Sequence, residues 1–181
     1  RDKEIIDTEL QLKDLETVEN RIKRVEKIAQ VGNDKNAKLE YTVLTVIREA
    51  LLEGNNARSV TFESKDEQTA ARNLFLLTSK PVLYVCNVDE GSAVSGNEYV
   101  ERVREAVAPE GAEILVVAAQ TEADIAELET FEERQEFLKD VGLEESGVNR
   151  LIKAAYKLLD LETFITAGEV EVHAWTYKRG W

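Results

Sequence analysis

Apolar residues recur at helical spacing in the first third of the chain. One set lies three or four residues apart and predicts a helix with a narrow apolar stripe: Leu15, Val18, Ile22, Val25 and Ala29. A second stripe repeats the pattern: Leu39, Val43, Val46 and Ala50. The turn-forming residues Gly32, Asn33 and Asp34 stand between them, with Gly32 placed to end the first helix. Residues 1–60 are therefore expected to form an antiparallel α-helical coiled-coil hairpin.

Beyond residue 60 the long stripes give way to shorter alternating segments. Ser64 followed by Glu67 is a capping-box signature and predicts a helix to about Leu77. The runs PVLYVC (81–86) and AEILVVAA (112–119) are continuous and apolar, which predicts strands buried on both faces. An amphipathic helix is expected between them, and the order strand, helix, strand implies that the two strands are parallel.

The remainder of the chain predicts more helix and then a β module. Helices are expected at about residues 122–140 and 147–159, so that residues 61–159 form an α/β domain. The alternating run GEVEVHAWTYKRGW predicts a strand at the end of the sequence. A single exposed strand is not a stable ending, so residues 160–181 are expected to begin a domain that continues further. Because the chain also contains no methionine, it is expected to be an excised segment.

Composition narrows the class of protein. The formal net charge of −13 argues against general affinity for nucleic acid, and no recognition of DNA sequence is expected. A single cysteine excludes an intramolecular disulfide framework and is typical of a reducing compartment. No apolar run approaches the roughly 20 residues that span a bilayer. The sequence therefore predicts a cytoplasmic protein without membrane association.

The charge is unevenly distributed along the chain. Residues 21–38, at the expected tip of the helical hairpin, hold six basic and two acidic side chains. Five of the bases are candidates for contact with RNA or the ribosome: Lys23, Arg24, Lys27, Lys35 and Lys38. A solvated helix face is an equally open alternative. The acid-rich residues 122–145 show no pattern typical of catalysis or metal binding, and are expected to be solvated surface.

Both predicted strands end in residues that suit a ligand site. The first is followed by Asn87-Val88-Asp89-Glu90, and the second ends in Ala118-Ala119-Gln120. Ligands bind at the carboxyl ends of strands in open parallel sheets. Loops of this kind on consecutive strands are typical of base recognition in P-loop GTPases, where the asparagine ties the two loops together. The alternative is an ordinary turn, which Asn and Asp favour.

Longer strings of the sequence resemble one family. These are LLTSKPVLYVCNVDE, then TEADIAEL, EERQEFL and finally GLEESGVNRLIKAAYKLLDLETFITAGEVEVHAWT. Together they resemble the YchF subfamily of Obg-related P-loop NTPases, the Obg-like ATPases. The resemblance implies the C-terminal half of a P-loop NTPase sheet with a helical insertion, followed by the truncated start of a TGS domain, a small β-grasp module.

The resemblance also implies a function for the full-length protein. It implies binding and hydrolysis of ATP, or GTP, with Mg²⁺, in association with the ribosome or the translation machinery. Neither G-x-x-x-x-G-K-[ST] nor D-x-x-G occurs in these 181 residues, and phosphate and metal binding need such a loop. We therefore expect no catalytic or metal-binding residues here and no hydrolysis by this chain alone. A ribosome-binding, RNA-binding or purely structural module without a nucleotide role is the alternative.

The candidate base loop departs from the pattern of guanine-selective proteins. Glu90 stands where they have aspartate, and Val88 stands where they have lysine. Glutamate is one methylene longer, so its carboxylate cannot take the same position against guanine, and discrimination is weakened. The resemblance implies relaxed or adenine-leaning specificity, with Asn87 and the Val88 backbone near the base. The alternative for Glu90 is a solvated loop acid.

Overall fold

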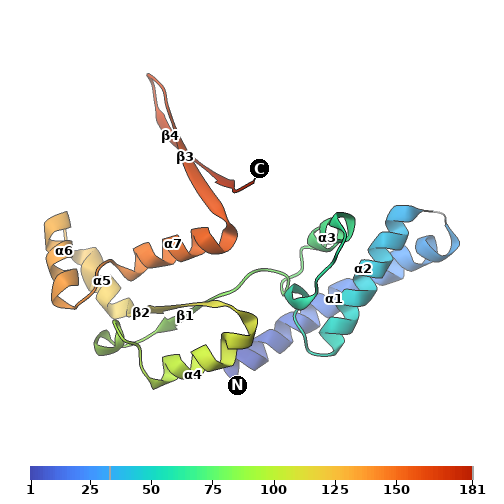
Figure 1. The fold of residues 1–181 in the computed structure, drawn as a ribbon, viewed down its shortest axis with the longest axis horizontal. Helices are drawn as coiled ribbons and strands as arrows, with labels where there is room; N and C mark the ends of the chain where they lie inside the picture. The colour runs from blue at the N-terminus through green and yellow to red at the C-terminus, as the bar shows by residue number, and fades with distance from the viewer. Residues whose placement is uncertain (33, 181) are drawn as a thin grey trace. The chain divides into compact units, whose positions relative to one another are not determined.

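The computed structural model describes residues 1–32 and 34–180 and divides into two compact units, Arg1–Lys80 and the segment from Pro81 onward. In the first unit, α1 (Asp2–Val31) and α2 (Lys35–Leu52) lie side by side in opposite directions, as the stripes predict (Figure 1). Asp34 begins α2 by accepting hydrogen bonds from the N–H groups of Asn36 (2.9 Å) and Ala37 (3.2 Å). Asn33 lies outside the described residues.

The core of the first unit lies along the hairpin. Its buried members are Val18, Val43, Leu44, Ile47, Leu51, Ala57 and Leu76. The predicted stripe on α1 is confirmed, but the stripe on α2 is partly wrong because Val46 is 40% exposed. α2 packs against α1 on one side and against α3 (Lys65–Arg72) and the 3₁₀ turn η1 (Ala57–Ser59) on another. A helix with neighbours on two sides buries a wider face than a coiled-coil seam.

A buried carboxylate joins the end of this unit to its first helix. Asp14 is only 2% exposed and accepts hydrogen bonds from the N–H groups of Leu77 (2.8 Å) and Thr78 (2.7 Å), and from the Thr78 hydroxyl (2.6 Å). The same hydroxyl oxygen accepts a bond from the N–H of Ala57 at 3.0 Å. A buried charge is tolerated only with such hydrogen-bond partners. Asp14 therefore fixes residues 77–78 to α1.

This arrangement explains why α3 is shorter than expected. The capping box of Ser64 and Glu67 is present and starts α3. The helix ends at Arg72, not near Leu77, because the N–H groups of Leu77 and Thr78 donate to Asp14 instead of to helix carbonyls. Phe75, which lies between Arg72 and Leu77, has a positive φ of 52° and is 80% exposed.

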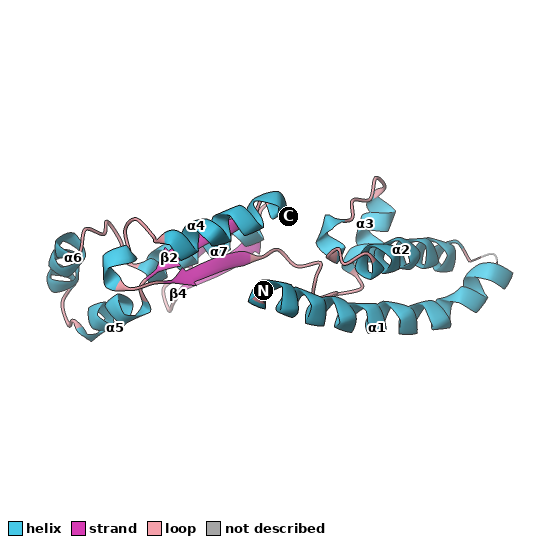
Figure 2. Ribbon diagram, turned by 90° about the horizontal axis from the view of Figure 1, so that it is seen from below, coloured by secondary structure: helices cyan, strands magenta, loops and turns pink. Residues whose placement is uncertain are grey.

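The second unit contains the predicted strand–helix–strand motif. β1 (Leu83–Asn87) and β2 (Glu113–Val117) pair in parallel, with Leu83 opposite Glu113 and Asn87 opposite Val117. Between them lie two 3₁₀ turns, η2 (Glu90–Ser92) and η3 (Ala108–Glu110), and the helix α4 (Glu98–Val107). α7 (Gly147–Leu159), labelled in Figure 2, packs against both strands. The expectation of burial on both faces is wrong for β1, because Val85 is 50% exposed; within the described residues β1 pairs with β2 alone.

The single helix expected at about residues 122–140 is two helices. α5 (Ala119–Glu127) and α6 (Phe131–Asp140) are separated because Thr130 and Glu133 form a second capping box that starts α6. The Arg134 guanidinium donates to the carbonyl oxygen of Leu128 from Nε (3.0 Å) and from a terminal nitrogen (2.7 Å), which stabilises the break. A capping box inside an otherwise helical pattern marks a new helix start.

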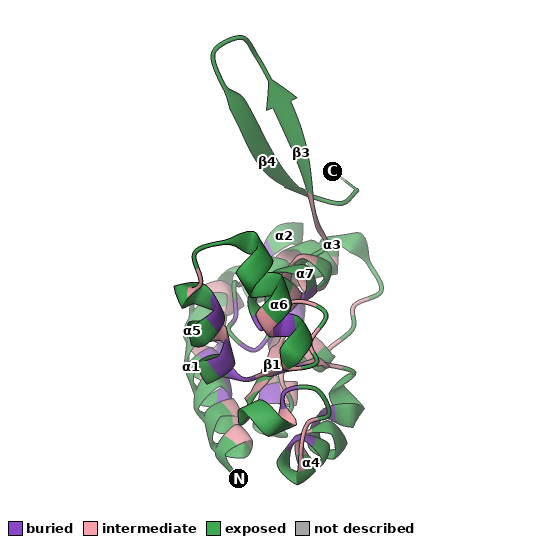
Figure 3. Ribbon diagram, turned by 90° about the vertical axis from the view of Figure 1, so that its left-hand side faces the viewer, coloured by how far each residue is buried: buried purple, intermediate pink, exposed green. Residues whose placement is uncertain are grey.

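The C-terminal segment is a hairpin instead of one strand. α7 ends at Leu159; the next residue, Asp160, turns the chain with a φ of 54°, and β3 (Leu161–Ala167) follows. β3 pairs antiparallel with β4 (Val172–Lys178), with Phe164 opposite Trp175. Both strands are exposed along most of their length (Figure 3). The alternating pattern identified β4, while the strand character of residues 161–167 was missed.

Candidate nucleotide-base site

The loops after β1 and β2 are joined by one side chain. Asn87, the last residue of β1, accepts a hydrogen bond from the Ala119 N–H through Oδ1 at 3.0 Å. Beside it, the Val88 N–H donates to the Val117 carbonyl oxygen at 2.9 Å. The two residues that Asn87 Oδ1 joins lie 32 positions apart in the sequence. The structure thus brings together the first loop (residues 87–90) and the second loop (residues 118–120), as the motif predicts.

The second loop is the start of helix α5. Ala118 is the N-cap residue, is 4% exposed, and has no side chain that accepts a hydrogen bond. Since the first N–H groups of a helix lack partners within it, Asn87 supplies from the other loop an acceptor for the first of them, that of Ala119. Ala119 and Gln120 are exposed, and Gln120 Nε2 donates to Asp124 Oδ1 at 3.0 Å. This loop therefore presents backbone and small side chains to solvent.

The two carboxylates of the first loop have different roles. Asp89 caps the turn η2, since its Oδ1 accepts hydrogen bonds from the Ser92 N–H and the Ser92 hydroxyl, both at 3.0 Å. Glu90 is exposed, and no hydrogen bond or ion pair holds its carboxylate within the described residues 1–32 and 34–180. Of the two acids, Glu90 is the one whose carboxylate accepts no hydrogen bond within the described residues, so it is the freer of the two to contact a ligand. The exposed position of the Glu90 carboxylate is compatible with base recognition and with the alternative of a solvated acid.

Sequence reasoning missed one acidic residue beside this site. Glu122 was expected to be solvated surface, but it is half-buried and accepts hydrogen bonds from the N–H groups of Gly147 (2.6 Å) and Val148 (3.1 Å). It therefore caps the start of α7. Its partners lie 25 and 26 residues away, so no local pattern revealed the contact. The neighbouring Thr121 is 2% exposed, and within the described residues 1–32 and 34–180 its hydroxyl is a buried oxygen without a hydrogen-bond partner.

The five candidate bases of the first unit are all exposed: Lys23, Arg24, Lys27, Lys35 and Lys38. Within the described part of the chain, none of the five forms a hydrogen bond or ion pair through its side chain. Other bases on the same helices do: Arg21 pairs with Glu40 across the hairpin at 2.5 Å, and Arg48 with Glu19 at 3.5 Å. Within the described residues, the structure thus separates ion-paired bases from a group at the tip that forms no ion pairs.

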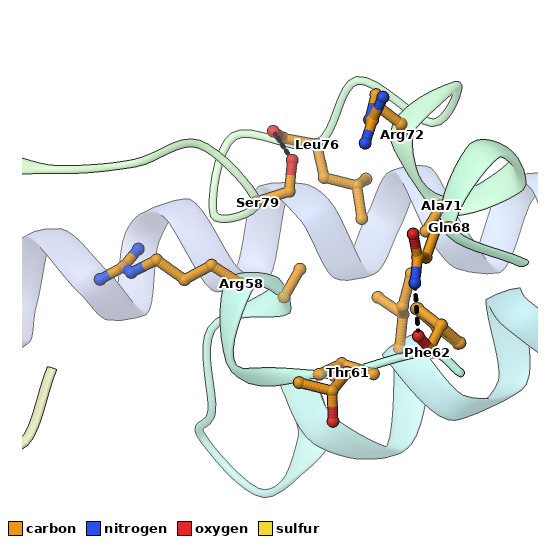
Figure 4. Close-up of a pocket in the computed structure, with 11 residues that line it drawn as sticks. Arg58, Thr61, Phe62, Gln68, Ala71, Arg72, Leu76 and Ser79 are labelled. Carbon is orange, nitrogen blue, oxygen red and sulfur yellow. Dashed lines mark hydrogen bonds between the residues drawn. The ribbon is translucent and has the colours of Figure 1, made fainter. Parts of the chain in front are cut away.

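A pocket of about 400 Å³ lies in the first unit, beside α3 (Figure 4). Its polar lining is partly used to hold the loops that frame it. Gln68 Nε2 donates to the Phe62 carbonyl oxygen and the Ser79 hydroxyl donates to the Leu76 carbonyl oxygen, both at 2.8 Å. None of the candidate base-site residues lines this pocket.

Metal-ligating side chains do not cluster in the part of the chain that the structure describes. No group of three or more His, Cys, Asp or Glu side chains suitable for a metal ion occurs within residues 1–32 and 34–180. Over the same residues, none of the helices has both the length and the apolar character needed to cross a bilayer.

Known proteins match this chain along nearly its whole length, although no family model does. It is 51% identical over 181 residues to the ribosome-binding ATPase YchF of Bacillus subtilis, a match that covers 99% of this chain and 49% of that protein. It is 32% identical over 182 residues to Obg-like ATPase 1 of Caenorhabditis elegans, covering 99% and 46% respectively.

A solved structure shares the fold. The YchF GTPase of Schizosaccharomyces pombe matches with a TM-score of 0.87 at 27% identity, over 100% of this chain and 49% of that one. The chain thus spans about half the length of the relatives it matches. Sequence similarity along nearly the whole chain and a common fold show that it belongs to the YchF family of Obg-related P-loop NTPases.

Proposed function

We propose that this chain provides the base-recognition part of a cytoplasmic P-loop NTPase that binds ATP, or GTP, and acts with the ribosome. The observation that carries the proposal is the hydrogen bond from the Ala119 N–H to Asn87 Oδ1 at 3.0 Å. It joins the two loops at the carboxyl ends of parallel strands, where α/β sheets bind ligands. The names of the YchF relatives, which include an ATPase, a GTPase and ribosome binding, support the same assignment.

The proposed contacts follow from the hydrogen-bonding groups that remain. Asn87 uses Oδ1 for the second loop, which leaves its Nδ2 to donate to a ring nitrogen common to adenine and guanine. The Val88 backbone, and Ala118, Ala119 and Gln120 of the second loop, would lie against the base. Glu90 would face the edge at which the two bases differ. The contacts that adenine and guanine share would explain the binding of both bases. The position of the Glu90 carboxylate would determine which base binds more tightly.

Specificity provides the test. Guanine offers a ring N–H and an amine that an aspartate bridges, whereas adenine offers an acceptor at the ring position. Glu90→Asp in the full-length protein should raise guanine-nucleotide affinity by about 1–3 kcal/mol and change adenine-nucleotide affinity less. Calorimetric titration of both nucleotides measures this, with Glu98→Asp, at another exposed acid, as the control. An unchanged preference would mean that Glu90 is a solvated acid.

The hydrolytic machinery is not assigned to these residues. The 181 residues contain no G-x-x-x-x-G-K-[ST] loop, which would hold the phosphates, or its Ser/Thr, which would contact Mg²⁺. Bound Mg²⁺ would neutralise phosphate charge in the full-length protein. The chain by itself should therefore hydrolyse neither ATP nor GTP. Turnover that follows the chain through purification to a single species would contradict this.

We propose the following domain assignment. Residues 1–60 form the helical coiled-coil insertion, residues 61–159 the C-terminal half of the NTPase domain, and residues 160–181 the start of a TGS-like β-grasp domain. Residues 61–80 of the NTPase half pack against the insertion within the compact unit Arg1–Lys80. The paired strands β3 and β4 and the position of α7 before them support the last assignment.

A second function is favoured by the tip of the hairpin. Its five exposed bases carry no ion pairs in the part of the chain that the structure describes, so they are available to bind phosphates. We propose that they contact ribosomal RNA while the acidic remainder limits nonspecific binding. The alternative is a solvated helix face.

Charge reversal decides between these alternatives. Changing all five tip bases to glutamate should weaken ribosome binding and flatten its salt dependence, by a slope of about 0.7 per lost phosphate contact. A matched control reverses five exposed bases elsewhere: Lys65, Arg72, Arg102, Lys139 and Lys178. Sedimentation with ribosomes over a salt series measures both quantities. Equal binding and an equal slope in the tip variant would show that the tip is not the contact.

A further inference from the structure

The second loop is held on both sides, and only one of its anchors belongs to the predicted motif. Asn87 accepts the Ala119 N–H at one end of the loop. One turn further along α5, the Glu122 N–H donates to the Ala118 carbonyl oxygen at 3.0 Å, so Glu122 closes the first turn of the helix that the loop begins. Its carboxylate then accepts hydrogen bonds from the N–H groups of Gly147 and Val148 at the start of α7.

The contact between Glu122 and α7 requires glycine at position 147. A Cβ atom added to Gly147 would lie 2.9 Å from Glu122 Oε1 and 2.9 Å from Val117 Cγ1. The glutamate end is pinned by two hydrogen bonds, and the valine is the last residue of β2. A side chain at position 147 would therefore push α7 away from the strand end and from Glu122.

These contacts form one connected set around the loop. β1 contributes Asn87, β2 contributes Val117, and α7 contributes the N–H groups that orient Glu122. Charge-assisted hydrogen bonds to a helix N-terminus are stronger than neutral ones. We propose that Glu122 and Gly147 are positioning residues, which hold the second loop in the conformation that binds the nucleotide base. This inference rests on the proposed base-recognition function.

Two variants test the inference in the full-length protein. Glu122→Gln keeps the length of the side chain but removes the charge and places an amide NH₂ against one N–H donor. Gly147→Ala introduces the close Cβ atom. Amide hydrogen exchange of residues 118–121 should become about tenfold faster in both variants. The matched controls are Glu127→Gln, an exposed acid on the same helix, and Gly168→Ala, where the nearest atom to a new Cβ is 3.7 Å away.

Steady-state kinetics distinguish a positioning role from a general loss of protein stability. The KM for ATP should rise about tenfold in both variants while kcat stays unchanged, because the proposed role of this loop is to contact the base and not the reacting phosphates. Competition by tripolyphosphate, which has no base, should be unaffected. A purely structural defect would instead lower kcat by reducing the folded fraction and leave KM unchanged.

Each remaining outcome decides the question. Unchanged exchange in residues 118–121 overturns the inference. Faster exchange with an unchanged KM also overturns it if Asn87→Ala raises the KM, because the base site then exists without needing Glu122. If Asn87→Ala leaves the KM unchanged as well, the proposed base-recognition function falls together with the inference.

Discussion

At the scale of single residues, short polar side chains carry the connections between segments far apart in the sequence. Asn87 caps a helix through an N–H group 32 residues later. Asp14 holds the backbone of Leu77 and Thr78, which lie 63 and 64 residues away. In each case the side chain accepts from backbone N–H groups that have no partner in their own element. Such contacts fix loop positions without a large apolar core.

Thr121 differs from these side chains because its hydroxyl joins no other segment within the described residues, and this difference leads to a prediction about stability. Its buried hydroxyl has no hydrogen-bond partner among the residues that the structure describes, and an unsatisfied buried group costs about 1–3 kcal/mol. Thr121→Val replaces the hydroxyl with a methyl group of similar size, so it should raise the free energy of unfolding by about 1 kcal/mol. Urea denaturation of both proteins measures the change.

Thr42→Val provides the control for that experiment. The Thr42 hydroxyl is exposed and donates to the Lys38 carbonyl oxygen at 3.0 Å, so its loss should have little effect. A Thr121→Val protein that is less stable than the parent would show that the hydroxyl is satisfied in solution.

At the scale of elements, helix starts depend on side-chain caps, and one of these caps titrates. The Glu133 carboxylate accepts a hydrogen bond from the Thr130 N–H at 3.0 Å, and this bond, with the Thr130 hydroxyl, holds the pKa of Glu133 below its ordinary value. A lowered pKa means that the folded state favours the charged form. The cap therefore stabilises α6 above the unfolded pKa, near 4.5, and this contribution is lost as the pH falls through the folded value.

Acidification should accordingly loosen the first turn of α6. Carbon chemical shifts of residues 131–134 should move toward random-coil values between about pH 5 and about pH 3. The Glu133→Gln variant keeps a capping oxygen without a titrating group, so its shifts should stay constant over this range. An acid transition that is the same in the variant and in the parent would mean that another group is responsible.

Elements with regular patterns were predictable from the sequence, and elements set by distant contacts were not. The hairpin helices, the parallel pair and the capping box at Ser64 follow from local spacing. The end of α3 depends on Asp14, which lies on another helix. The break before α6 had a local signal in Thr130 and Glu133, but the surrounding helical pattern obscured it. β3 was missed because LETFITA follows α7 without a separating turn of Gly or Pro.

At the scale of the whole molecule, the candidate site likewise combines residues that the sequence pattern predicts with residues that only distant contacts reveal. The residues Asn87, Val88 and Glu90 and the second loop were predicted because strand ends in a parallel pair converge. The hydrogen bond that joins Asn87 to the second loop is present. Glu122 and Gly147 were not predicted, because an acid in an acidic run and a glycine after a turn carry no signal until α7 is placed against β2. Resemblance identified the family, and the structure revealed the contacts of Glu122 and Gly147.

The proposed function depends on contact between the nucleotide base and the two loops at the ends of β1 and β2. Photolabelling of the full-length protein with an azidoadenine derivative of ATP detects this contact itself, with adducts located by mass spectrometry. We expect adducts within residues 87–90 and 118–120 that disappear when excess ATP is added. ATP-protected adducts confined to peptides outside both loops would contradict the proposal.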